Sequence, residues 1–251
     1  MTKREEGRAA AGRRKPRVVD EKAVEAGNGG GGAIRQRNIR KILKAAETVF
    51  ARDSFAGAST AEIARKAGVP KANLHYYFRT KQDLYSAVLV EIVESWLDAL
   101  EEIEPDSDPA NALGDYIVKK MEASWNSPQP SRLWAIEVIG GARNVQPYLK
   151  NRLRTLVQEK SEIVNGWIAD GKIKPVDPPH LFFMIWAMTQ TYADFSAQIT
   201  AVLDKKSLDD EDFDNATRTV LRLVLGGLGL DPEKAGWSPG TQPAKKRGKG
   251  K

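Results

Sequence analysis

The sequence contains no cysteine among its 251 residues. This absence excludes disulfide bridges, thiolate catalysis and cysteine-based zinc sites, and it weakly favours a reducing compartment. No apolar run approaches the roughly 20 residues of a membrane span, since the longest, LFFMIWAM, ends at Thr189 and Gln190. The first residues lead into no apolar stretch typical of a signal peptide. We therefore expect a cytoplasmic protein that makes no contact with a membrane.

The sequence also lacks the catalytic and metal-binding motifs of common enzyme classes. The two histidines, His75 and His180, lack the spacing of metal ligands. The segment GGLGL at 226–230 has no phosphate-loop pattern, and no Ser/His/Asp arrangement can be named. We therefore expect no catalytic residues, no metal site and no cofactor, and an enzyme is the least favoured class.

Strand patterns are absent, whereas apolar residues recur at helical spacing along most of the chain. The sequence predicts an all-α protein with an N-terminal helix-turn-helix domain of three helices (37–82) and a helical ligand-binding and dimerisation domain (83–230). Basic tails, expected to be disordered, flank them at 1–36 and 231–251. After a first helix containing IRKILKAAETVFA, we expect helices over 60–67, 71–77, 81–103, 109–126, 130–140, 145–170, 178–203 and 209–227.

Charge separates the predicted domains. Residues 37–81 hold 10 Lys and Arg against 3 Asp and Glu, whereas residues 82–230 hold 14 against 23. Clustered positive charge favours a polyanionic partner, because each phosphate that is neutralised releases counterions. The sequence therefore predicts that the N-terminal domain binds nucleic acid and that the acidic body does not.

The segment TAEIARKAGVPKANLHYYF predicts two short helices joined by a tight turn. Thr60 is a candidate cap for the first helix, Gly68 suits its end, and Pro70 suits the start of the second. Leu74 and Phe78 lie four residues apart and are expected to pack on the first helix. This arrangement is a helix-turn-helix, whose second helix enters the major groove of double-stranded DNA.

The polar residues of this segment suggest individual roles. Asn73 and His75 are expected to reach base edges, whereas Lys71, Tyr76 and Lys81 are expected to hold phosphates. An ordinary surface hairpin with amphipathic tyrosines is the alternative. The predicted DNA-binding residues are Thr60, Lys71, Ala72, Asn73, His75, Tyr76 and Lys81.

The stretch STAEIARKAGVPKANLHYYFRTKQDLYSAVL resembles the DNA-binding domain of TetR-family regulators. The resemblance implies a helical homodimer with a variable ligand-binding body, usually acting as a repressor. The segments SRLWAIEVIGGA and IWAMTQTYADF are similar to a pyrimidine-responsive subgroup of that family. This likeness implies a planar ligand such as uracil or a related nucleobase, and control of pyrimidine or related nitrogen catabolism.

The residues of the body give separate support for a sensor. Phe183, Trp186 and Gln190 share one face of a predicted helix, and an amide beside aromatic rings is typical of a ligand pocket. A hydrogen bond from Gln190 within the core is the alternative. By the family resemblance Trp96 also lines the pocket. The predicted ligand-binding residues are Trp96, Trp186, Thr189, Gln190 and Tyr192.

The last predicted helix has a broad apolar face of Val220, Leu221, Val224, Leu225 and Leu228. Either a second copy of the chain or the chain itself covers this face. The sequence thus favours a ligand-controlled homodimeric regulator. A DNA-bound architectural or interaction protein of the same fold, without a small ligand, is the alternative.

Overall fold

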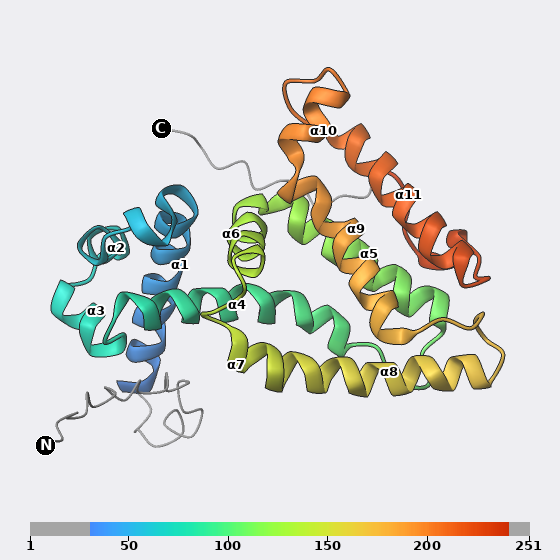
Figure 1. Cartoon of the computed structure of the whole chain (residues 1–251), viewed down its shortest axis with the longest axis horizontal. Helices are drawn as coiled ribbons and strands as arrows, with labels where there is room; N and C mark the ends of the chain where they lie inside the picture. Colours follow the sequence, from blue (N-terminus) through green and yellow to red (C-terminus); the bar gives the residue numbers. More distant parts are fainter. Residues whose placement is uncertain (1–30, 241–251) are drawn as a thin grey trace, which may run out of the picture.

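The computed structural model describes residues 31–240, and the regular elements in that range are all helical (Figure 1). The prediction of an all-α protein is therefore confirmed. The elements in chain order are α1 (Gly31–Gly57), α2 (Thr60–Ala67), α3 (Lys71–Tyr77), α4 (Lys81–Glu101), α5 (Pro109–Asn126), α6 (Pro128–Ile139), α7 (Gln146–Tyr148), η2 (Leu149–Leu153), α8 (Arg154–Ala169), α9 (Pro178–Asp194), α10 (Ser196–Val202), α11 (Asp210–Gly227) and η3 (Pro232–Ala235).

Helices α1, α2 and α3 form a small head at one end of the molecule (Figure 1). Its core contains Val49, Phe50, Ile63 and Leu74, all fully buried. Helix α1 begins at Gly31, so the predicted tail boundary at residue 36 is wrong for 31–36. Those residues include good helix formers that extend α1 by one more turn and a half. Residues 1–30 of that tail lie outside the described part of the chain.

Helix α4 joins the head to the body and spans both (Figure 1). Thr80 and Asp83 form a reciprocal capping box at its start. At its end, the ammonium of Lys160 on α8 donates to the carbonyls of Glu101, at 2.8 Å, and Ile103, at 2.7 Å. The backbone groups at both ends of α4 therefore have partners, which holds this connecting helix in place.

The body packs α9 and α11 against α5, which lies at its centre (Figure 1). Tyr116 of α5, Phe182 of α9 and Phe213 of α11 are almost completely buried at these contacts. The helix predicted over 178–203 is interrupted at Phe195, whose backbone leaves the helical region with φ −112° and ψ 25°. The interruption divides that segment into α9 and α10. No helix within residues 31–240 is long and apolar enough to cross a membrane.

The apolar face of α11 is covered by the chain itself. Its five side chains, Val220, Leu221, Val224, Leu225 and Leu228, are all buried within the single chain. Helix α5, which contacts α11, supplies much of the covering surface. Of the two explanations open from the sequence, burial within the chain is therefore the one observed, and this face is not available to a second copy.

The segment after α11 also belongs to the packed body. Ala235 of η3 is buried against Gly114 of α5, and Trp237 packs on the core. The backbone N–H of Gly240 donates to Asp214 Oδ2 at 3.1 Å. The prediction that the C-terminal tail begins at residue 231 is thus wrong for 231–240, because Ala235 and Trp237 there pack against the body. Residues 241–251 lie outside the described range.

Candidate DNA interface and effector site

The turn of the helix-turn-helix is built from local capping interactions. Ser59, and not Thr60, is the cap of α2, because its hydroxyl accepts from the N–H of Ala61 at 3.3 Å. The predicted cap is therefore shifted by one residue, and Thr60 is the first residue of the helix. Gly68 ends α2 with φ 66°, a left-handed conformation that favours glycine. These caps fix the angle at which α3 leaves α2.

Helix α3 buries one face and exposes the other. Leu74 and Phe78 are buried in the head, as the sequence predicts. The opposite face exposes the five α3 members of the predicted DNA-binding set, Lys71, Ala72, Asn73, His75 and Tyr76. Tyr76 is 78% exposed, which is unusual for a large aromatic side chain. The structure thus brings these five residues together on one accessible surface.

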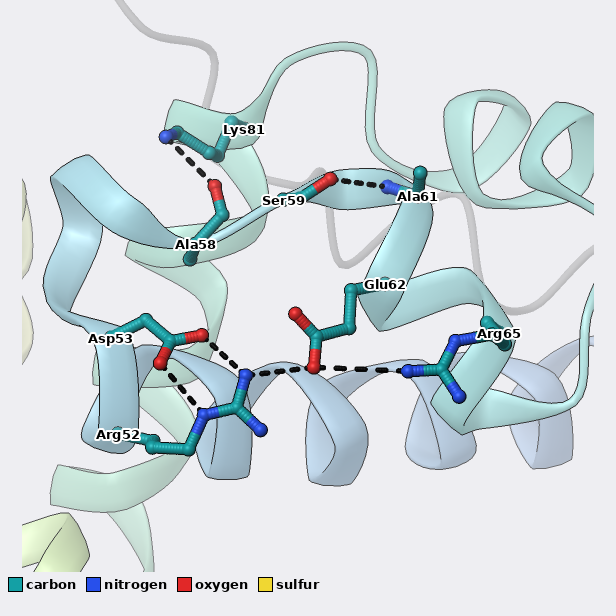
Figure 2. Close-up of polar contacts among 8 residues, drawn as sticks. All are labelled: Arg52, Asp53, Ala58, Ser59, Ala61, Glu62, Arg65 and Lys81. Atoms are coloured by element: carbon teal, nitrogen blue, oxygen red, sulfur yellow. Dashed lines mark hydrogen bonds and ion pairs between the residues drawn. The ribbon is translucent and has the colours of Figure 1, made fainter.

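An ionic network holds α2 against the end of α1 (Figure 2). The guanidinium of Arg52 donates to both carboxylate oxygens of Asp53 and also to Glu62 on α2, the last at 2.7 Å. Between these partners, Ser54 kinks α1 with φ 57° and ψ 177°, a region that non-glycine residues rarely adopt. Because α3 packs on α2, the network also sets the position of α3.

Lys81, the first residue of α4, has partners within the chain. Its ammonium donates to the carbonyl of Ala58 at 3.1 Å (Figure 2). It also donates to the carbonyl of Ala56 at 3.4 Å. It also lies 4.6 Å from the centre of the Phe55 ring. These contacts join α4 to the end of α1 and account for Lys81 without DNA. We therefore leave Lys81 out of the proposed phosphate contacts.

The aromatic residues predicted for the sensor come from several helices of the body. Trp96 of α4 is buried and packs edge-on against Trp134 of α6, with ring centres 6.2 Å apart. Trp186 of α9 is partly buried, and its indole N–H donates to the hydroxyl of Tyr116 on α5 at 2.6 Å. Three helices, α4, α6 and α9, thus each contribute an indole ring to the packing of the body.

The polar residues predicted beside them divide into two kinds. Thr189 is fully buried, and its hydroxyl donates to the carbonyl of Ile185 at 2.8 Å, so its role is structural. Gln190 is partly buried, and its amide has no hydrogen-bond partner within residues 31–240. Tyr192 packs against Trp125, with ring centres 6.3 Å apart. Gln190 is therefore the predicted polar residue that is best placed to receive a ligand.

The structure adds Lys120, which the sequence analysis missed. Lys120 on α5 is only 4% exposed, and its ammonium lies 4.8 Å from the centre of the Trp96 ring. Burial lowers the pKa of Lys120 to about 7, although the charge of Asp194 on α9 opposes this shift. Asp194 itself accepts a hydrogen bond from the Ser131 hydroxyl at 2.6 Å. A buried, titratable group thus lies among the predicted sensor residues.

A cleft of about 170 Å³ opens between α4 and α5. Trp96 and Lys120 line it, and Asp98, Glu102 and Lys119 lie around it. Trp186, Thr189, Gln190 and Tyr192 do not line this cleft. The predicted ligand residues therefore do not form a single open pocket, and the accessible part of the site is on the side of Trp96 and Lys120.

Comparison with known proteins gives the family of both parts of the chain. Residues 42–88 match the family of bacterial regulatory proteins known as tetR, and residues 89–231 match the C-terminal region of YcdC-like proteins. The chain is 41% identical over 189 residues to the HTH-type transcriptional regulator RutR of Escherichia coli K12, covering 75% of this chain and 89% of that one. The HTH-type transcriptional repressor NicS of Pseudomonas putida is 34% identical over 82 residues, covering 32% of this chain and 39% of NicS.

A solved structure supports the same fold. A regulatory protein of the tetR family from Rhodococcus RHA1 superposes with a TM-score of 0.60 at 18% identity, over 77% of this chain and 98% of that protein. The head, the long connecting helix and the helical body thus have the fold of that structure. The family matches and the similarity to a transcriptional regulator do not favour the architectural alternative. The chain belongs to the TetR family of ligand-responsive, DNA-binding transcriptional regulators, and it is not an enzyme.

Proposed function

We propose that this protein is a homodimeric repressor that binds a palindromic operator through α3 and is released by a planar nucleobase-like ligand. The exposed polar face of α3, held by the buried Leu74 and Phe78, is the observation that carries this proposal. The similarity of the chain to RutR supports target genes in pyrimidine or related nitrogen catabolism. The helix-turn-helix accounts for DNA binding, and the body accounts for its control.

The two copies would meet through the outer faces of α9 and α11. Leu223 of α11 is 60% exposed, and Phe183 and Met184 of α9 are 44% and 51% exposed. Helices α9 and α11 run in opposite directions, so these three residues lie toward the same end of the pair (Figure 1). Pairing of this surface would place two α3 helices on one side of the dimer, with half-sites one helical turn apart or a multiple of it.

The proposed ligand is uracil or a closely related planar ring. Trp96 and Trp186 offer aromatic faces, and the free amide of Gln190 offers a donor and an acceptor for the edge of such a ring. Trp96 lies on α4, the helix that runs into the head. Ligand contacts with α4 would therefore change the distance between the two α3 helices of the dimer and lower its affinity for DNA.

Substitutions on α3 test the assignment of the DNA contacts. Replacing Lys71 by Ala is expected to lower the affinity for all DNA sequences alike. It should also reduce the slope of log affinity against log salt concentration by about one, as the loss of one phosphate contact does. Replacing Asn73 by Ala is expected to change the preferred bases instead. Binding to a randomised DNA pool over several salt concentrations measures both effects. Unchanged relative preferences for Asn73→Ala would remove that residue from base recognition.

A further inference from the structure

Two buried lysines of the body differ in their partners. Lys160 is 8% exposed, and its ammonium donates to the carbonyls of Glu101 and Ile103. Lys120 is 4% exposed, yet its ammonium has no hydrogen-bond acceptor anywhere in residues 31–240. An ammonium has three donors, and that of Lys120 is not among the atoms that are fully enclosed without a partner, so it reaches the cleft between α4 and α5. Lys160 thus has a structural role, whereas the contacts of Lys120 do not explain why a lysine is there.

The surroundings of Lys120 leave room for an acceptor. The ring of Trp96 attracts the ammonium but supplies no hydrogen-bond acceptor, and both residues line the cleft between α4 and α5. Of the nearby carboxylates, Asp194 accepts from Ser131 and Glu102 pairs with Lys119. Asp98 lines the cleft without a bond to Lys120. An oxygen atom that enters this cleft would therefore meet a free donor.

The register of α5 and α9 relates Lys120 to the proposed ligand site. The hydroxyl of Tyr116 on α5 accepts a hydrogen bond from the indole of Trp186 on α9. Farther along both helices, Trp125 of α5 packs against Tyr192 of α9. The two helices therefore run in the same direction. Lys120 and Gln190 each follow the first contact by four residues, so they lie at the same level of the two helices.

We propose that Lys120 donates to an anionic oxygen of the effector, so that the preferred ligand is a planar ring carrying an acidic group. This inference rests on the nucleobase-like ligand of the proposed function and narrows its chemical class. The ring would lie against Trp96 in the cleft between α4 and α5, and its charged oxygen would face Lys120. A neutral ring of the same shape would leave the ammonium without an anionic oxygen in hydrogen-bond contact. An ionised ring should therefore bind at least about tenfold more tightly.

Uracil and barbiturate form a suitable pair of probes. Barbiturate is a pyrimidine ring with one more oxygen than uracil, and it is ionised at neutral pH, whereas uracil is neutral. We expect titration calorimetry of the full chain to show at least about tenfold tighter binding of barbiturate. Lys120→Met, which keeps the length of the side chain without its charge, is expected to remove this preference.

Lys160→Met is the matched control. It should keep the preference for barbiturate but lower the melting temperature, because it leaves two carbonyls at the end of α4 without their partner. Lys120→Met should instead melt at the same temperature as the wild type or higher. Calorimetry in two buffers of different ionisation enthalpy should also show proton uptake when barbiturate binds the wild type at pH 8, and none in Lys120→Met.

Equal affinity for the two rings, or a preference for barbiturate that survives Lys120→Met, would overturn the inference while leaving a nucleobase ligand in place. Tighter binding of uracil than of barbiturate would do the same. If neither ring binds, the nucleobase ligand of the proposed function fails, and the inference fails with it. These outcomes separate an error in the chemical class of the ligand from an error in the proposed function.

Discussion

Raising the pH from about 7 to about 10 is expected to stabilise the ligand-free protein, by as much as about 4 kcal/mol from Lys120 alone. Burial lowers the pKa of Lys120 from 10.5 to about 7 in the folded chain. Within this window the unfolded chain binds a proton that the folded chain does not. The free energy of unfolding therefore rises with pH until the lysine of the unfolded chain also loses its proton.

The difference between wild type and Lys120→Met isolates this contribution. The charges around Lys120 are Asp194 on α9, Asp98 on α4, Glu102 just after α4, and its neighbour Lys119. All four are retained in the variant. Urea unfolding at several pH values is expected to show a gap that favours the variant near pH 7 and closes as the pH rises. A gap that is constant from pH 7 to pH 10 would show that Lys120 is not buried as an uncompensated charge.

Replacing Gly114 by Ala is expected to destabilise the body by about 1–3 kcal/mol, the range seen for overpacked cores. A β-carbon at this position of α5 would lie 2.6 Å from Ala235 Cβ and 2.9 Å from Ala235 Cα. The backbone of η3 would have to move away. Gly166→Ala on the exposed side of α8 is the control, because nothing lies within 4 Å of its added carbon. That change is expected to stabilise the protein by up to about 1 kcal/mol.

Truncation after Leu230 provides a second test of the same contact. Without η3, a β-carbon at residue 114 has no close neighbour from that segment, so Gly114→Ala should become neutral or stabilising in the shortened chain. Chemical unfolding of the four proteins gives the coupling between the two changes. If Gly114→Ala cost as much without η3 as with it, the packing of η3 on α5 would not be the cause.

Local signals were sufficient to predict the helices of the head. Helical periodicity, Gly68 and Pro70 place α2 and α3 within the observed bounds, and Leu74 and Phe78 are buried as predicted. The cap was assigned to Thr60 instead of Ser59, because two adjacent hydroxyl residues are equally suited to capping. Only the structure shows which of them lies just outside the helix.

Contacts between distant segments account for most of what the sequence did not show. Lys81 appeared free to hold a phosphate until the structure placed it against carbonyls at the end of α1. The apolar face of α11 suggested a dimer surface, because a single sequence does not show that α5 covers it. Phe195 carries no glycine or proline signal that would predict the break between α9 and α10.

The burial of Lys120 was not predicted, although the sequence of α5 contains a signal for it. Leu113, Tyr116, Ile117 and Met121 form the buried stripe of α5, and Lys120 falls within this stripe at helical spacing. Its neighbour Lys119 lies on the exposed side of the helix. A charged residue in a buried stripe is a candidate for function, because burial of an unpaired charge is costly.

Linkage between ligand and operator tests the central claim most directly. Operator DNA, identified by genome-wide binding, would be titrated with the full chain in the absence and presence of saturating uracil or barbiturate. We expect one of these rings to lower the affinity for the operator by about 100-fold, and bound operator to lower the affinity for the ring by the same factor. Operator affinity that is unchanged by a ring that binds the protein would contradict the claim that this ligand controls DNA binding.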